Sequence, residues 1–217
     1  YDFDRLRRKL GLTVEAATAP ATAAAPTPAG DVTAMGVAEL SGLDPNSLSD
    51  ALLEQAFRSA VQLDARELAG RFARALVGRP AQAGGPDRWP FFQQLIQEAQ
   101  AAGDYDAALG LVDEGEKADC EANEGRRRND YELRRGRLLA RGGHGEQARD
   151  VFDRLLARTP ENVQAAGGAA EAMLGAKQPK DALKFAEHGL AQARAQNNRD
   201  SESYFLELVQ AAKKQGA

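Results

Sequence analysis

The chain has few of the residues on which disulfide frameworks, redox sites and metal centres depend. Its 217 residues include one cysteine, Cys120, and two histidines, His144 and His188. A single cysteine cannot form an intrachain disulfide, and neither histidine has a second ligand at a metal-binding spacing such as H-E-x-x-H. Cys120 also lacks a base at a recognisable spacing. We therefore expect no metal, no other cofactor and no catalytic nucleophile.

Three further absences exclude broad classes of function. No apolar run approaches the length needed to cross a membrane, and the net charge of −4 gives no overall field that would attract nucleic acid. The glycine-containing segments 74–86 and 140–147 lack the GxxxxGK[ST] pattern of a phosphate-binding loop. The sequence therefore favours a non-enzymatic protein without a transmembrane segment and without a nucleic-acid partner.

Aromatic residues are also scarce, at 6% of the chain, and much of the hydrophobic content is alanine. Alanine-rich helices pack closely without large side chains, which suits a helical repeat better than a thick globular core. Arginine outnumbers lysine, which is typical of proteins from GC-rich bacterial genomes. No signal peptide is visible, so we expect a cytoplasmic protein, but the chain begins with Tyr1 and not Met, which leaves a lost N-terminal signal or anchor open.

The first 31 residues divide into two segments that do not belong to the repeats. Residues 1–12 predict a short amphipathic helix, since Phe3, Leu6 and Leu10 share one face and basic residues cover most of the rest. Residues 13–31 are an Ala/Thr/Pro tract that predicts a flexible linker. The helix is a candidate docking segment for a partner, a second copy or its own chain. Weak membrane-surface binding and a frayed tail are the alternatives.

From residue 89 onward, an apolar stripe, a small residue and a turn recur in the same order. The units are 89–122, 129–162 and 163–195, and a last helix at 201–215 repeats the pattern of a first helix. Ala108, Ala148 and Ala182 coincide when the units are aligned by their turns. Only a small side chain fits where two helix backbones approach closely, so these alanines predict helix crossings. A degenerate earlier pair is expected over 47–80.

These residues resemble the tetratricopeptide repeat family. Ala148, Phe152 and Pro160 stand at the family's A-x3-F and closing-proline spacings, and Gly136 matches the small residue of its first helix. The resemblance covers about residues 89–217 and is weaker over 47–80. Glu132 and Ala166 replace the usual aromatic of the first helix. The resemblance implies an all-α, right-handed solenoid of antiparallel helix pairs that holds a peptide or a partner helix on its concave face.

In such a solenoid the concave wall is built by the first helix of each pair. The ring of Lys and Asn with which some family members hold chaperone C-termini is missing, which argues against that kind of receptor. A merely solvated surface is the alternative to partner binding. The positions expected to contact a partner are Gln93, Gln97, Gln100, Leu133, Arg134, Arg137, Glu171, Leu206 and Gln210.

The densest charge feature is a group of seven arginines between residues 126 and 141. Arg134, Arg137 and Arg141 share one helical face. One interpretation is a docking patch for carboxylates or phosphates, because arginine makes bidentate contacts. The other is a solvated face balanced by neighbouring acids, namely Glu121, Glu124, Asp130 and Glu132.

The sequence thus predicts a short helix at 1–12, a linker at 13–31 and a helical solenoid at 32–217. Its expected function is that of a protein–protein interaction adaptor or assembly scaffold, whose partner is another protein, a peptide or a second copy of itself. The alternative is a regulatory C-terminal region of a larger enzyme, such as a kinase, or of a membrane-anchored assembly factor.

Overall fold

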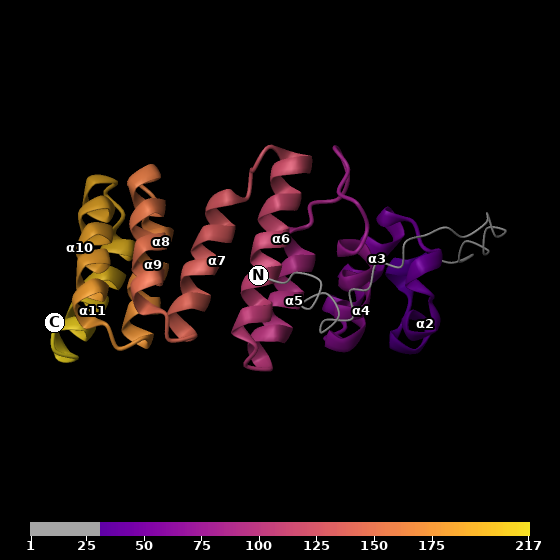
Figure 1. Cartoon of the computed structure of the whole chain (residues 1–217), viewed down its shortest axis with the longest axis horizontal. Helices are drawn as coiled ribbons and strands as arrows, with labels where there is room; N and C mark the ends of the chain where they lie inside the picture. Colours follow the sequence, from indigo (N-terminus) through magenta and orange to yellow (C-terminus); the bar gives the residue numbers. More distant parts are fainter. Residues whose placement is uncertain (1–30) are drawn as a thin grey trace. The chain divides into compact units, whose positions relative to one another are not determined.

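The computed structural model describes residues 31–217, and all of the secondary structure in this part is helical (Figure 1). The prediction of an all-α fold is therefore confirmed for these residues. The predicted docking segment with Phe3, Leu6 and Leu10, and the predicted linker up to residue 30, lie outside the described residues. The chain divides into two compact units, a first unit that ends at Arg126 and a second unit, Arg127–Ala217.

The first unit begins with short elements and continues with longer helices. Successive long helices pack on one another, and α2 and the two 3-10 helices lie against α3 and α4. The elements are η1 Val32–Ala34, α2 Val37–Gly42, η2 Pro45–Ser47, α3 Asp50–Gln62, α4 Arg66–Val77, α5 Trp89–Ala101 and α6 Tyr105–Asn123.

The start of the first unit differs from the sequence prediction. Before the pair expected over 47–80, the chain forms α2 between two 3-10 helices. The next helix begins at Asp50 and not near Ser47, because the Ser49 hydroxyl accepts a hydrogen bond from the Leu52 amide at 3.3 Å and caps α3. Phe57 of α3 is buried and Ala51 is exposed.

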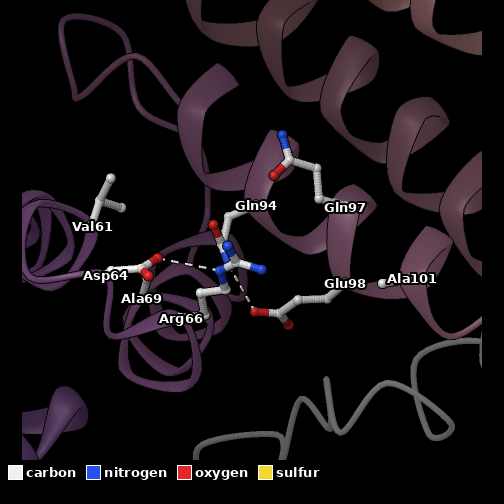
Figure 2. A pocket seen from close by; sticks show the side chains of 8 residues that line it. All are labelled: Val61, Asp64, Arg66, Ala69, Gln94, Gln97, Glu98 and Ala101. Atoms are coloured by element: carbon white, nitrogen blue, oxygen red, sulfur yellow. Dashed lines mark hydrogen bonds and ion pairs between the residues drawn. The ribbon is translucent and has the colours of Figure 1, made fainter.

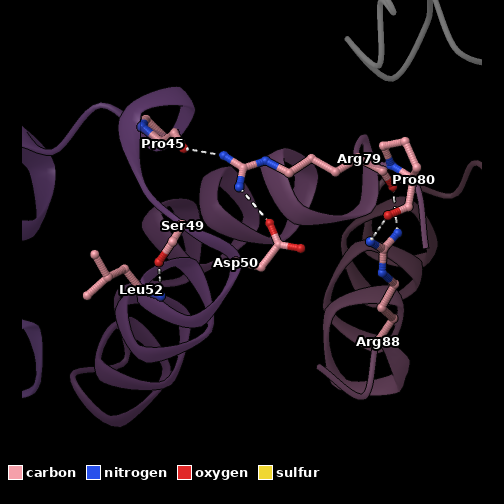
Figure 3. Close-up of polar contacts among 7 residues, drawn as sticks. All are labelled: Pro45, Ser49, Asp50, Leu52, Arg79, Pro80 and Arg88. Atoms are coloured by element: carbon pink, nitrogen blue, oxygen red, sulfur yellow. Dashed lines mark hydrogen bonds and ion pairs between the residues drawn. The ribbon is translucent and has the colours of Figure 1, made fainter. Parts of the chain in front are cut away.

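Two arginines hold the long connection between α4 and α5 (Figure 3). Arg88 is only 8% exposed and donates to the carbonyl oxygens of Arg79 and Pro80 at 2.6 and 2.7 Å. Arg79 in turn donates to the Asp50 carboxylate at 2.6 Å and to the Pro45 carbonyl at 3.1 Å. Burial lowers the pKa of Arg88. The Pro/Gly loop is thereby fixed to the start of α3 by charged hydrogen bonds.

The second unit is built from five helices joined by short turns. Neighbouring helices pack in pairs, and α7 also packs on α9, and α9 on α11 (Figure 1). The helices are α7 Arg128–Arg141, α8 Gly145–Arg158, α9 Val163–Gly175, α10 Pro179–Ala195 and α11 Arg199–Lys214.

The turns expected from the repeats lie where the sequence placed them. Gly103 (φ +74°) follows α5 and Gly143 (φ +87°) follows α7. In this left-handed conformation glycine lets the next amide return to the helix, and the His144 amide donates to the Leu139 carbonyl at 2.8 Å. The result in each case is two helices joined by a short turn.

Aromatic rings rest on glycines at two helix crossings of the second unit. A Cβ atom added to Gly136 of α7 would overlap the ring of Phe152 of α8, and one added to Gly189 of α10 would overlap the ring of Phe205 of α11. The alanines expected at close crossings are fully buried: Ala108 in the first unit, and Ala148 and Ala182 in the second, are 0% exposed. Small residues thus bring these helices close enough to enclose the rings.

Candidate functional site

The nine residues expected on one binding face divide between the two units. Gln93, Gln97 and Gln100 lie on α5 of the first unit, where Gln97 is exposed and the other two are half-buried. The other six lie in the second unit, on three helices that pack side by side. They are Leu133, Arg134 and Arg137 on α7, Glu171 on α9, and Leu206 and Gln210 on α11.

Helix α9 is the centre of this second group because of two adjacent glycines. Asn162 caps the helix by accepting from the Ala165 amide at 2.9 Å. One turn later, a Cβ on Gly167 would lie within 3.0 Å of the Tyr204 ring and hydroxyl, and a Cβ on Gly168 would lie 3.1 Å from Leu133 Cδ1. The side chains of α7 and α11 therefore cover α9 from both sides, at positions where only glycine leaves room.

The Glu171 carboxylate lies between the same two helices. The Tyr204 hydroxyl donates to Oε1 at 2.8 Å, and Oε2 lies 3.9 Å from Nη2 of Arg137. Burial, followed by this hydrogen bond, raises the pKa of Tyr204, so the hydroxyl stays protonated and donates at physiological pH. We name the group of Leu133, Arg137, Glu171 and Tyr204 the α9 face.

The α9 face contains three of the predicted residues, namely Leu133, Arg137 and Glu171. Leu206 and Gln210 are exposed on α11, but Tyr204, about 200° around the helix from Leu206, is the residue that contacts α9. The repeat pattern pointed to Leu206 and Gln210 on this helix and did not select Tyr204. Two consecutive glycines inside a helix are unfavourable by roughly 1 kcal/mol each, so the pair in α9 was a usable signal of close contact.

The acids near the arginine group are paired in part with arginines outside the predicted face. Asp130 lies 3.4 Å from Arg127, and Glu132 pairs with Arg158 of α8. Arg134 is half-buried, and its pKa is lowered by burial first and then by the charges of its arginine neighbours. Among the described residues, its Nε and Nη2 atoms have no hydrogen-bond partner.

The first unit has a pocket of its own, of about 290 Å³, beside the α3–α4 turn (Figure 2). Glu98 lies on its wall, held by Arg74 at 2.7 Å and by Gln94 at 3.1 Å. Of the three predicted glutamines only Gln97 lines it. The other lining residues named in Figure 2 are Val61, Asp64, Arg66, Ala69 and Ala101.

Over residues 31–217, no three His, Cys, Asp or Glu side chains come together as metal ligands would. Cys120 is an exposed free thiol on α6. The second unit places an aliphatic, an aromatic, a cationic and an anionic side chain around α9: Tyr204 donates to Glu171, Arg137 lies 3.9 Å from Glu171, and Leu133 lies beside Gly168.

None of the helices in the described part of the chain combines the length and the apolar character of a membrane span. No protein-family model matches the chain, and no curated protein matches it either.

Proposed function

We propose that the chain is a non-catalytic protein–protein interaction adaptor or assembly scaffold that binds a peptide or a partner helix across α7, α9 and α11. The observation that carries the proposal is the α9 face. There, two glycines bring side chains from three helices onto one surface, and Glu171, Tyr204 and part of Arg137 stay accessible. Alternating apolar and charged groups on a preformed surface suit recognition of an amphipathic segment.

The helix pairing supports a solenoid of tetratricopeptide-like units as the framework. In the second unit, α7 with α8 and α9 with α10 form pairs, and the first helix of each pair also packs on the first helix of the next. The fully buried Ala148 and Ala182 lie on the second helices at equivalent places. In a right-handed solenoid of this kind the first helices form the concave wall, which is where a partner would lie.

The proposal is tested with the partner captured by the whole chain from cells that encode it. Leu133→Ala combined with Arg137→Glu should weaken the complex while far-UV circular dichroism stays unchanged. A matched double variant on α8, Ala157→Ser with Arg154→Glu, alters exposed positions of a second helix and should leave the complex intact. Loss of the complex in the α8 variant alone would show that the partner binds elsewhere.

A further experiment distinguishes binding of a different protein from self-association, because the partner can be another copy of the chain. Light scattering of the wild-type chain gives the mass, and the α7 double variant should lower it only if the α9 face holds a second copy. An unchanged mass together with a lost complex assigns the face to a different protein.

A further inference from the structure

Three arginines on α7 have much less negative charge around them than the sequence suggests. Of the acids close to them in sequence, Asp130 lies beside Arg127, and Glu132 pairs with Arg158. Among residues 31–217 the one carboxylate within 4.0 Å of Arg134, Arg137 or Arg141 belongs to Glu171. Asp130 and Glu132 therefore do not balance the charges of Arg134, Arg137 and Arg141.

The Glu171 carboxylate also neutralises little of the positive charge of these three arginines. Arg137 Nη2 lies 3.9 Å from Glu171, too far for a hydrogen bond, and Tyr204 donates to the other oxygen of Glu171. Arg134 and Arg141 stand one turn to either side of Arg137. Burial lowers the pKa of Arg134 most, and the charges of Arg137 and Arg141 lower it further. The three guanidinium groups therefore act on one another as like charges on a single helix face.

The accessible members of this group can still bind an anion. The Arg137 side chain is 37% exposed, and Arg141 is exposed at the end of α7. Guanidinium groups hold carboxylates through paired hydrogen bonds, and each has donors that no described residue uses. Leu133, one turn before Arg137, and Tyr204 across α9 offer apolar surface beside them.

We propose that the α9 face selects an acidic segment of its protein partner, in which Glu or Asp side chains pair with Arg137 and Arg141 and intervening apolar side chains contact Leu133 and Tyr204. This inference rests on the proposed function and specifies the chemistry of the partner. A nucleic acid is less favoured, because Glu171 lies within the face and a single aromatic ring provides no series of stacking surfaces for bases.

The test uses the whole chain and a fluorescein-labelled peptide of about twelve residues that repeats Glu-Leu-Glu. Amidation of its C-terminus removes the terminal carboxylate, so that binding reports on side chains. A second peptide has Gln at every Glu position. Fluorescence polarisation should give a Kd about tenfold lower for the acidic peptide, and the difference should shrink in 0.5 M NaCl because exposed ion pairs are screened.

Variants then locate the interaction. Arg137→Gln with Arg141→Gln should raise the Kd of the acidic peptide about tenfold and leave that of the Gln peptide unchanged, since the variant removes two exposed ion pairs with the peptide's carboxylates. The matched control is Arg154→Gln, which removes a positive charge from an exposed position on α8 and should change the Kd less than about twofold.

Three outcomes would overturn the inference. Equal affinity for the two peptides, or binding of neither, would show that carboxylates are not selected. An equal effect of Arg154→Gln would show a nonspecific charge effect. Stronger competition by a single-stranded oligothymidylate of about the same length would assign the arginines to nucleic acid. If the two peptides bind with equal affinity and Leu133→Ala weakens both, the binding face stands and only its acidic preference is wrong.

Discussion

The two units have buried apolar cores, and each adds a different kind of contact that holds its elements in place. In the first unit, the connection between α4 and α5 is fixed by Arg79 and Arg88, through four hydrogen bonds to carbonyls and one carboxylate. In the second unit, the rings of Phe152 and Phe205 rest on glycines of the facing helices. The contacts in the first unit require donors and acceptors that point at one another. The contacts in the second unit require that the ring and the facing residue fit in the space between two helices.

This difference predicts different sensitivities. Replacing the buried guanidinium of the first unit leaves carbonyl oxygens without donors. The loss in free energy of unfolding then comes from missing hydrogen bonds. Removing a buried ring of the second unit leaves a cavity. The loss in free energy of unfolding then comes from missing packing contacts. The glycines also link packing with recognition in the second unit, because Gly168 accommodates Arg137 and Leu133 of the α9 face.

The largest effect is expected for Phe152→Ala in the second unit. Phe152 is 0% exposed and also packs edge-on against Phe185 at 5.8 Å, so its removal should lower the free energy of unfolding by about 3–5 kcal/mol. Urea denaturation followed by circular dichroism measures the loss, and hydrogen exchange should locate it to α7 and α8. Faster exchange confined to α3–α5 would contradict the assignment.

Arg88→Met in the first unit is expected to have the next largest effect. The substitution keeps much of the volume but leaves the Arg79 and Pro80 carbonyls without their donor, at a cost of about 1.5–3 kcal/mol. The control is Arg66→Met, because the Arg66 side chain is 83% exposed and its ion pair with Asp64 is superficial. Equal melting temperatures for the two variants would show that Arg88 does not hold the connection between α4 and α5.

Ala148→Leu and Ala182→Leu test the helix crossings of the second unit. Each alanine is 0% exposed, so the added atoms should overpack the contact and cost about 1–3 kcal/mol. The matched controls are Ala157→Leu on α8 and Ala191→Leu on α10, at exposed positions. A melting temperature that is unchanged in the buried variants would mean that the repeat phase is wrongly assigned.

The smallest effect is a contrast between two glycines of α9. Gly175→Ala adds a Cβ into open space and should stabilise the chain by about 0.5–1 kcal/mol through the lower entropy of the unfolded state. Gly168→Ala gains the same helix propensity but forces Arg137 and Leu133 to move, so the gain should be absent. Equal melting temperatures for the two variants would show that Gly168 does not position the α9 face.

Local periodicity was enough to predict the helices, because helical spacing and turn residues act over a few neighbours. The turns at Gly103 and Gly143 and the burial of Ala148 followed from such signals. The exact start of α3 did not, since the earlier pair was expected from residue 47 and the Ser49 cap places the first residue of α3 at Asp50.

The candidate site was predicted only in part for a related reason. Leu133, Arg137 and Glu171 could be found by aligning repeats, because equivalent positions on first helices share a direction. Tyr204 could not, because its place over Gly167 depends on how α11 packs against α9. The same limit applied to the arginines of α7, because contacts between helices pair Glu132 with Arg158 of α8 and leave Glu171 of α9 beside Arg137.

The sequence by itself determined that the described chain is helical and where its helices turn, because spacing, capping and glycine act locally. Only the tertiary structure decided which charges are compensated and which aromatic ring rests on which glycine. These outcomes depend on distances between residues far apart in the chain, such as Arg137 and Glu171 or Gly167 and Tyr204. Coulomb energy and packing both change steeply over an ångström, a scale that residue order alone does not specify.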